Sequence, residues 1–308
     1  KEIDFDSFNI IHSSSQPVSF NATIIKDNNI KCQTKIIFKF ESNVINDFFI
    51  QELQRYLIIN FKIEGITYYV FPMDNFAIII CNESCCTLKN IKINYNNSLM
   101  QYFVFENDNK NKPINYFLNN IAKSCSLQAC IQLLLSLGDR HLDNTLINYD
   151  GQIFHIDFEH ILIHPSFSIK CMLLKNQKVL FTSSILNLIG NNNNEYFKVL
   201  LDETKRITTI IKSEIQIVIL FLYPLLHSNK FSKVDLINHI ESFLLGGAKD
   251  SRGIDTLLKK STSTSADCRL LDLFSQAQDS GTAILTTLNN TNNALSLLNK
   301  IKFVLSFF

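Results

Sequence analysis

The sequence predicts an α+β fold in which a smaller, β-rich part precedes a larger part built mainly from helices. In the first eighty or so residues, β-branched and aromatic residues cluster in short runs that are typical of strands. From about Thr87 onward, longer segments with helical character dominate. The chain has 308 residues and 46% hydrophobic composition, so it can bury a sizeable core or two lobes that share a cleft.

The first part contains β-prone runs and one helical segment. The helical segment covers residues 46–58, where Phe49, Leu53 and Tyr56 recur at spacings of four and three. The strands that we expect around it include residues 23–26, 35–40 and 76–81. For the larger part we expect helices at residues 125–137, 195–212 and 215–226, polar loops at residues 106–113 and 190–194, and a flexible break at residues 261–265.

Composition narrows the class of protein. The 29 basic and 28 acidic residues nearly cancel, which gives no reason to expect nucleic-acid binding. The eight cysteines form no Cys-X-X-Cys pair, so the pattern favours buried, reduced thiols of an intracellular protein over a zinc site. No signal peptide is visible, and the opening at Lys1 suits a piece of a longer protein. The longest apolar stretch, residues 215–226, is too short to span a bilayer.

The most informative segment covers residues 138–158. Two β-prone runs flank the turn-forming sequence Tyr149-Asp150-Gly151, which predicts a β-hairpin. A turn centred on Tyr149 and Asp150 would place Asn144 opposite His155, with Asp157 about 7 Å further along the strand. An amide oxygen and a carboxylate at the open end of one hairpin are hard ligands that suit Mg²⁺.

Three further polar residues, Asp139, Arg140 and His141, directly precede this hairpin. They offer a carboxylate, a fixed cation and an imidazole near the same place. Phosphoryl transfer needs such groups, because metal ions neutralise the phosphate oxygens, a cation stabilises the spreading charge, and a base orients the attacking hydroxyl. We expect His155, by contrast, to face the core as a structural hydrogen-bonding residue.

The sequence Gly138-Asp-Arg-His-Leu-Asp-Asn, followed by Phe154-His-Ile-Asp-Phe, resembles the catalytic and metal-binding loops of the phosphatidylinositol 3-/4-kinase superfamily. Within that superfamily it most resembles the class III phosphatidylinositol 3-kinases. The resemblance covers about residues 10–260. It implies a two-lobed, protein-kinase-like fold with an N-lobe at residues 1–82, a C-lobe at residues 83–260, and a flexible break and C-terminal helix at residues 261–308.

The resemblance also implies a set of site residues. Lys39 falls where the family places its ATP-binding lysine, and Asp47 falls where it has an acid at the start of the next helix. On its own Lys39 would be a surface lysine, and only its spacing from Asp47 and from the later loop favours ATP binding. The further residues implied are Ser13 and Ser14 for the phosphate-covering loop, Ile80, Cys81 and Asn82 for the hinge that touches adenine, Asp139, Arg140 and His141 for catalysis, and Asn144 and Asp157 for Mg²⁺ (or Mn²⁺).

Three departures from the family pattern bear on activity. Glu159 follows Asp157-Phe158 where lipid kinases normally have Gly, and it adds a charge beside the proposed metal site. Gln16 stands where many relatives carry a basic residue, and residues 41–46 lack the family's Gly-Asp-Asp-Leu-Arg-Gln pattern. These departures keep open an alternative, a catalytically impaired pseudokinase that serves as a scaffold.

The resemblance implies a lipid kinase that transfers the γ-phosphate of ATP to the 3-hydroxyl of phosphatidylinositol. A phosphatidylinositol 4-kinase and a related protein kinase are the alternatives among enzymes. The expected activation segment, residues 160–174, contains only Lys170 as a fixed cation, besides His160 and His164. Recognition of polyphosphorylated inositides needs a cation for each extra phosphate, so this segment favours unphosphorylated phosphatidylinositol.

The expected location and partners also follow from the resemblance. It implies a cytoplasmic protein, peripheral on endosomal or other internal membranes, that works with regulatory protein subunits in membrane trafficking and autophagy. In the tail, residues 296–308 place apolar side chains at helical spacing on one face. This helix either docks on the large lobe or contacts the membrane, with Lys300 and Lys302 toward lipid phosphates, and the sequence leaves both open.

Overall fold

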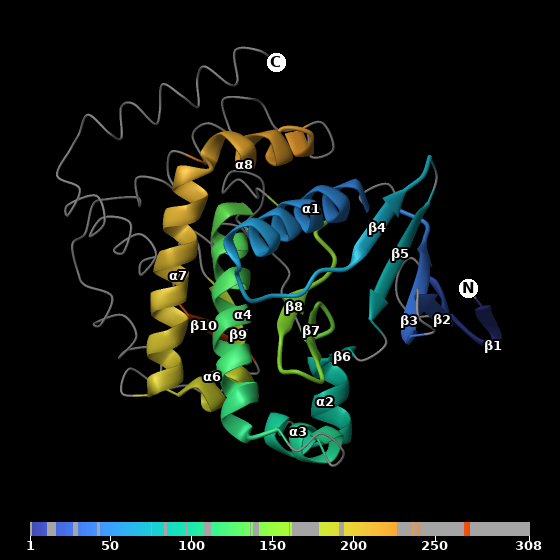
Figure 1. Ribbon diagram of the computed structural model, residues 1–308, viewed down its shortest axis with the longest axis horizontal. Helices are drawn as coiled ribbons and strands as arrows, with labels where there is room; N and C mark the ends of the chain where they lie inside the picture. The colour runs from blue at the N-terminus through green and yellow to red at the C-terminus, as the bar shows by residue number, and fades with distance from the viewer. Residues whose placement is uncertain are drawn as a thin grey trace, which may run out of the picture.

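The computed structural model of the chain has a five-stranded sheet at one end and a body of helices at the other (Figure 1). The sheet and the first helix come from the first 82 residues, and helices dominate from Leu88 onward. This order confirms the α+β fold predicted from the sequence. The structure describes residues 2–10, 17–26, 30–41, 44–74, 76–82, 85–96, 98–107, 112–135, 137, 142–159, 161, 179–190, 194–226, 236, 240 and 268–271.

The five-stranded sheet is antiparallel throughout, with strand order β1-β2-β3-β5-β4. The ring of Phe38 contacts that of Phe20 on the neighbouring strand and that of Phe76, just before the next strand, with centroid distances of 5.6 and 6.1 Å. Such cross-strand aromatic pairs contribute about 0.2–1 kcal/mol each. The strands overlap the three predicted runs and add two more: β1 (Glu2–Ile10), β2 (Val18–Lys26), β3 (Ile30–Lys39), β4 (Tyr69–Pro72) and β5 (Ala77–Asn82).

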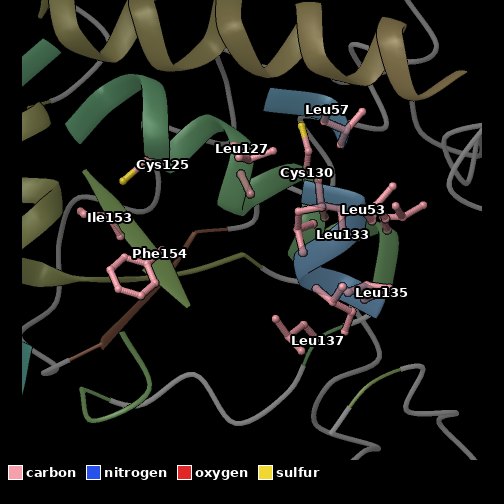
Figure 2. Packing of buried hydrophobic residues seen from close by; sticks show 14 of the residues in the cluster. Leu53, Leu57, Cys125, Leu127, Cys130, Leu133, Leu135, Leu137, Ile153 and Phe154 are labelled. Carbon is pink, nitrogen blue, oxygen red and sulfur yellow. The ribbon is translucent and has the colours of Figure 1, made fainter. Parts of the chain in front are cut away.

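Helix α1 (Val44–Phe61) connects the sheet to the helical body. It covers the predicted helix and extends it by two or three residues at each end. Its residues Leu53 and Leu57 are fully buried and belong to one hydrophobic cluster with Cys130 and Leu133 of the longest helix (Figure 2). Burying one leucine side chain contributes about 1.5–3 kcal/mol, so this face of α1 holds the two parts of the molecule together.

The helical body is built around α4 (Ile114–Leu135), which contains the predicted helix at residues 125–137 up to Leu135. From Asn120 to Leu135 nearly every residue of α4 is buried. The predicted helices at residues 195–212 and 215–226 correspond to α7 and to the segment that begins with α8. The other described helices of this body are α2 (Leu88–Asn94), α3 (Leu99–Asn107), α6 (Ser183–Ile189), α7 (Glu195–Ser213) and α8 (Ile215–Leu222).

Helix α7 runs along α4 (Figure 1), and small side chains of α4 hydrogen-bond to its backbone. The Ser126 hydroxyl donates to the backbone oxygen of Leu200 at 2.9 Å, and the Cys130 thiol donates to that of Thr204 at 3.6 Å. These bonds satisfy polar groups that would otherwise be costly in the core. Ser124 of α4 accepts a hydrogen bond from the backbone N–H of Ile153 at 2.9 Å, so α4 also supports the segment that carries the candidate site.

Two smaller sheets complete the described structure. One has the order β6-β7-β8, from β6 (Cys85–Thr87), β7 (Thr145–Asn148) and β8 (Ile153–His155). In the other, β9 (Val179–Thr182) pairs with β10 (Cys268–Leu271), a strand that we did not predict. The expected C-terminal helix lies outside the described residues, and the domain boundaries remain predictions. Among the described helices, none combines the length and the apolar character needed to cross a bilayer.

Candidate active site

The predicted hairpin is formed by β7 and β8, and its turn has a specific local cause. Gly151 adopts φ of +84°, a left-handed conformation that costs glycine little. The side-chain oxygen of Asn148 accepts hydrogen bonds from the backbone N–H groups of Asp150 and Gln152, at 3.0 and 2.8 Å. Together these contacts fix a loop of three residues instead of two.

The three-residue loop changes the register of the hairpin. Thr145 pairs with His155, and the backbone N–H of Ile156 donates to the backbone oxygen of Asn144 at 3.1 Å. The predicted pairing of Asn144 with His155 is therefore wrong by one residue, because Gly151 belongs to the loop. The correction brings Asp157 one position nearer to Asn144, and both still emerge at the open end of the hairpin.

Asp157 has an unusual backbone conformation. Its φ is +60°, which only a few per cent of residues other than glycine adopt and which Asp tolerates better than most. Such backbone strain persists only where the surrounding structure holds it in place. The side chain of Asp157 is 37% exposed, whereas Asn144 is buried. The carboxylate therefore remains accessible to a ligand from solvent.

The first turn of α1 holds this strained segment from the other lobe. Phe158, next to Asp157, is fully buried, and its backbone oxygen accepts a hydrogen bond from the Asn46 side chain at 3.1 Å. The backbone of Phe158 also hydrogen-bonds to the buried carboxyl group of Asp47. The Tyr68 hydroxyl donates to the same carboxyl group at 2.5 Å.

Charge and burial compete at Asp47. Burial raises the pKa of its carboxyl group above the usual value, while the charge of Lys39 and the hydrogen bond from Tyr68 act in the opposite direction. The sequence placed Asp47 at the start of a helix near Lys39, and it lies there, in the first turn of α1.

Lys39, at the end of β3, is the cation of the site. Its ammonium lies 2.7 Å from the carboxylate of Glu41 and 3.3 Å from that of Asp157. Burial by itself would lower the pKa of Lys39, but the charges of Asp47 and Asp157 and the contact with Glu41 outweigh burial, so the pKa lies above its usual value. Lys39 therefore stays charged at neutral pH and can bind an anion.

The expected hinge residues, Ile80, Cys81 and Asn82, lie at the end of β5. Pairing with β4 stops at Ile80, so the backbone edge of the next two residues extends past that strand. The hydroxyl of Thr34 donates to the backbone oxygen of Cys81 at 2.7 Å. Burial raises the pKa of the Cys81 thiol to about 11, so this group contributes backbone atoms and not a reactive thiolate.

His155 has the structural environment that the sequence predicted. It is 1% exposed, and its ring nitrogens lie 2.8 Å from the Gln132 amide nitrogen and 3.3 Å from the Thr145 hydroxyl. These contacts fix the base of the hairpin against α4, because both ring nitrogens are occupied within the core.

Several predicted site residues lie outside the described residues. They are Ser13 and Ser14 of the phosphate-covering loop and Asp139, Arg140 and His141 of the catalytic loop. Of the expected activation segment, the structure describes only Ile161. The roles of these residues remain predictions.

The structure adds three contacts that the sequence did not reveal. Glu41 pairs with Lys39, Asn46 binds the backbone of Phe158, and Tyr68 binds Asp47. Asn46 could have been found from its place beside Asp47 in the first helical turn. Tyr68 follows a stretch without helix or strand, so no local pattern in the sequence marks it.

The donor set at the open end of the hairpin suits a hard divalent cation. The amide oxygen of Asn144 and the carboxylate of Asp157 are oxygen ligands of the kind that Mg²⁺ prefers, and Mg²⁺ commonly takes its other ligands from water and substrate phosphates. In the described part of the chain, no group of three or more His, Cys, Asp and Glu residues could hold a metal. Two such ligands would leave the remaining positions of a Mg²⁺ ion to water and to phosphate oxygens.

Comparison with known proteins gives a consistent result. A family model described as phosphatidylinositol 3- and 4-kinase matches residues 26–223. A phosphatidylinositol 3-kinase of Schizosaccharomyces pombe is 40% identical over 82 residues, which is 25% of this chain and 10% of that protein. One from Candida glabrata is 37% identical over 73 residues (23% and 8%), and one from Saccharomyces cerevisiae is 49% identical over 47 residues (15% and 5%). The matched segments thus span a tenth or less of these relatives.

Proposed function

Because this chain belongs to the phosphatidylinositol 3- and 4-kinase family, we propose that it transfers the γ-phosphate of ATP to the 3-hydroxyl of phosphatidylinositol. The observation that carries the proposal is the meeting of Lys39 with Asp157 at 3.3 Å, since it joins a cation from one lobe to a carboxylate from the other. ATP-dependent transfer needs these two charges at one place, for the phosphates and for their metal ion.

In this proposal, the residues of the N-lobe hold the nucleotide. Lys39 binds the α- and β-phosphates as a charged donor, and Asp47 stabilises that charge from its buried position. The backbone of Cys81 and Asn82 contacts adenine beyond the end of β4. Ser13 and Ser14 cover the phosphates.

The residues of the C-lobe position the reacting groups. Asn144 and Asp157 hold Mg²⁺ or Mn²⁺, which when bound neutralises charge on the phosphate oxygens. Asp139 and His141 form the base system that accepts the proton of the inositol hydroxyl, and Arg140 supports the charge that spreads over the transferred group. The hold of Asn46 and Asp47 on Phe158 keeps Asp157 in its strained, productive conformation.

Two observations favour phosphatidylinositol as the substrate. The similar proteins from three fungi are each named as phosphatidylinositol 3-kinases. Lys170 is the one lysine in residues 160–174, and that stretch has no arginine, which favours a headgroup without extra phosphates. From the resemblance to class III phosphatidylinositol 3-kinases, we further propose that the protein acts at the surface of endosomal or other internal membranes, in trafficking and autophagy, with regulatory subunits as partners.

A scaffold without catalytic activity is the second candidate. It is favoured by Glu159, which is exposed directly after Phe158, and by Glu41, which pairs with the candidate ATP lysine. A carboxylate at either place adds negative charge where phosphates must bind.

The ring position of the product tests the proposed substrate. We expect the chain, incubated with ATP, Mg²⁺ and phosphatidylinositol vesicles, to yield phosphatidylinositol 3-phosphate when the deacylated product is separated by chromatography. A 4-phosphate would keep the kinase mechanism and reject the 3-hydroxyl. Vesicles of phosphatidylinositol 4,5-bisphosphate serve as the matched control and should be labelled poorly, because the activation segment has a single lysine.

A further inference from the structure

Three carboxyl groups act on the charge of the Lys39 ammonium, and they are not equivalent. Asp47 is buried and is held by Tyr68 and by the backbone of Phe158. Asp157 lies 3.3 Å from the ammonium and has the proposed role of metal ligand. Glu41 lies nearest, at 2.7 Å, its side chain is 25% exposed, and neither of those roles applies to it.

We propose that Glu41 competes with nucleotide phosphate for the ammonium of Lys39 and so lowers the affinity of the site for ATP. The inference rests on the proposed function, because it takes Lys39 as the phosphate-binding residue. Glu41 would then be a residue that determines nucleotide affinity. It is the first of residues 41–46, which lack the family pattern.

The number of N–H donors on Lys39 and the charge of Glu41 explain why Glu41 and phosphate compete. A lysine ammonium has three N–H donors, and the carboxylates of Glu41 and Asp157 each lie within reach of one. A phosphate that binds Lys39 must share or displace these partners, and it meets a like charge on Glu41 at the same ammonium. Asp47 cannot leave its buried position, but Glu41 is partly exposed and can turn toward water.

The geometry also explains why Lys39 needs no nucleotide to stay in place. Its side chain is 12% exposed and already paired, so its position is set before any phosphate arrives. Because the ammonium is already paired, a phosphate that binds Lys39 must break or weaken the contact between Lys39 and Glu41. The structure therefore predicts tighter nucleotide binding when the charge of Glu41 is removed and its shape is kept.

The test is the dissociation constant of ADP with Mg²⁺, measured by titration calorimetry for the wild-type chain and for Glu41→Gln. We expect Glu41→Gln to bind about three- to tenfold more tightly, the range set by one partly exposed ion pair and the relief of like-charge repulsion. The KM for ATP should fall by the same factor while kcat stays within about twofold. Asp202→Asn is the matched control, because it removes one carboxylate from an exposed place on α7, and it should bind as the wild type does.

Each outcome separates this inference from the proposed function. If the wild type binds ADP and Glu41→Gln binds equally or more weakly, Glu41 is not a competitor and the proposed function stands. If neither protein binds ADP while both remain folded, Lys39 is not a nucleotide site, and the proposed function and this inference are both wrong. A fall in kcat with an unchanged KM for ATP would also overturn the inference, since it would give Glu41 a role in transfer.

Discussion

Replacing Lys39 by Met is expected to lower kcat/KM for ATP by a factor of about 10²–10³, the usual effect of removing one preorganised charge from a transition state. The variant keeps the length of the side chain and loses the ammonium that faces Glu41 and Asp157. Without this cation, the carboxylates of Glu41 and Asp157 remain at the phosphate site and repel the nucleotide. Affinity for ADP with Mg²⁺ should fall in parallel with kcat/KM.

The Lys39→Met experiment needs a check of folding, because the lysine also balances the buried Asp47. Thermal unfolding of the variant shows whether a loss of binding reflects the site alone. Lys198→Met, which removes an exposed lysine of α7, is the matched control and should retain wild-type kinetics. A folded Lys39→Met protein that binds ADP as tightly as the wild type would contradict the assignment of Lys39.

Replacing Gly151 by Ala is expected to lower the free energy of unfolding by about 2–3 kcal/mol, because the residue would be held at a strained φ of +84°. An added Cβ would also lie 2.9 Å from the backbone oxygen and 3.2 Å from the Cα of Phe117, and this helical backbone cannot easily move. The hairpin that carries Asn144 and Asp157 would shift, so activity should fall together with stability.

Gly65→Ala is the matched control for Gly151→Ala. Its Cβ would lie 2.7 Å from a methyl carbon of Leu127 and 3.2 Å from the Cδ1 of Ile58, which are ends of side chains that can adjust. Urea denaturation of the two variants should therefore show the larger loss for Gly151→Ala. Equal losses would mean that backbone conformation at residue 151 does not set the hairpin geometry.

Local patterns in the sequence were sufficient for most elements of the fold. Apolar spacing located α1 and α7, and β-branched runs located β2, β3 and β5, because each signal reflects burial of one face. Strands β1, β4 and β10 were not among the predicted runs; β4 and β10 have only four residues each, and β9, the partner of β10, lies far away in the chain.

The sequence predicted several residues of the candidate site, but not which of them contact one another. The resemblance placed Lys39, Asp47, Asn144 and Asp157, and the structure brings Lys39 to Asp157 across a separation of 118 residues. The predicted register of the hairpin was wrong. The same sequence permits a two-residue or a three-residue loop, and the left-handed conformation of Gly151 belongs to the longer one. The pairing of Glu41 with Lys39 was missed, because a change from the family pattern does not tell where the new side chain points.

The most direct test of the central claim is the transfer of labelled γ-phosphate from ATP to phosphatidylinositol vesicles, measured for the wild type beside Asp157→Asn and Asp150→Asn. The two variants remove one carboxylate each from opposite ends of the same hairpin. We predict Mg²⁺-dependent labelling by the wild type and Asp150→Asn, and a loss of about a hundredfold or more in Asp157→Asn. A folded wild-type chain that binds ADP but labels no lipid with either Mg²⁺ or Mn²⁺ would contradict the claim and favour the scaffold.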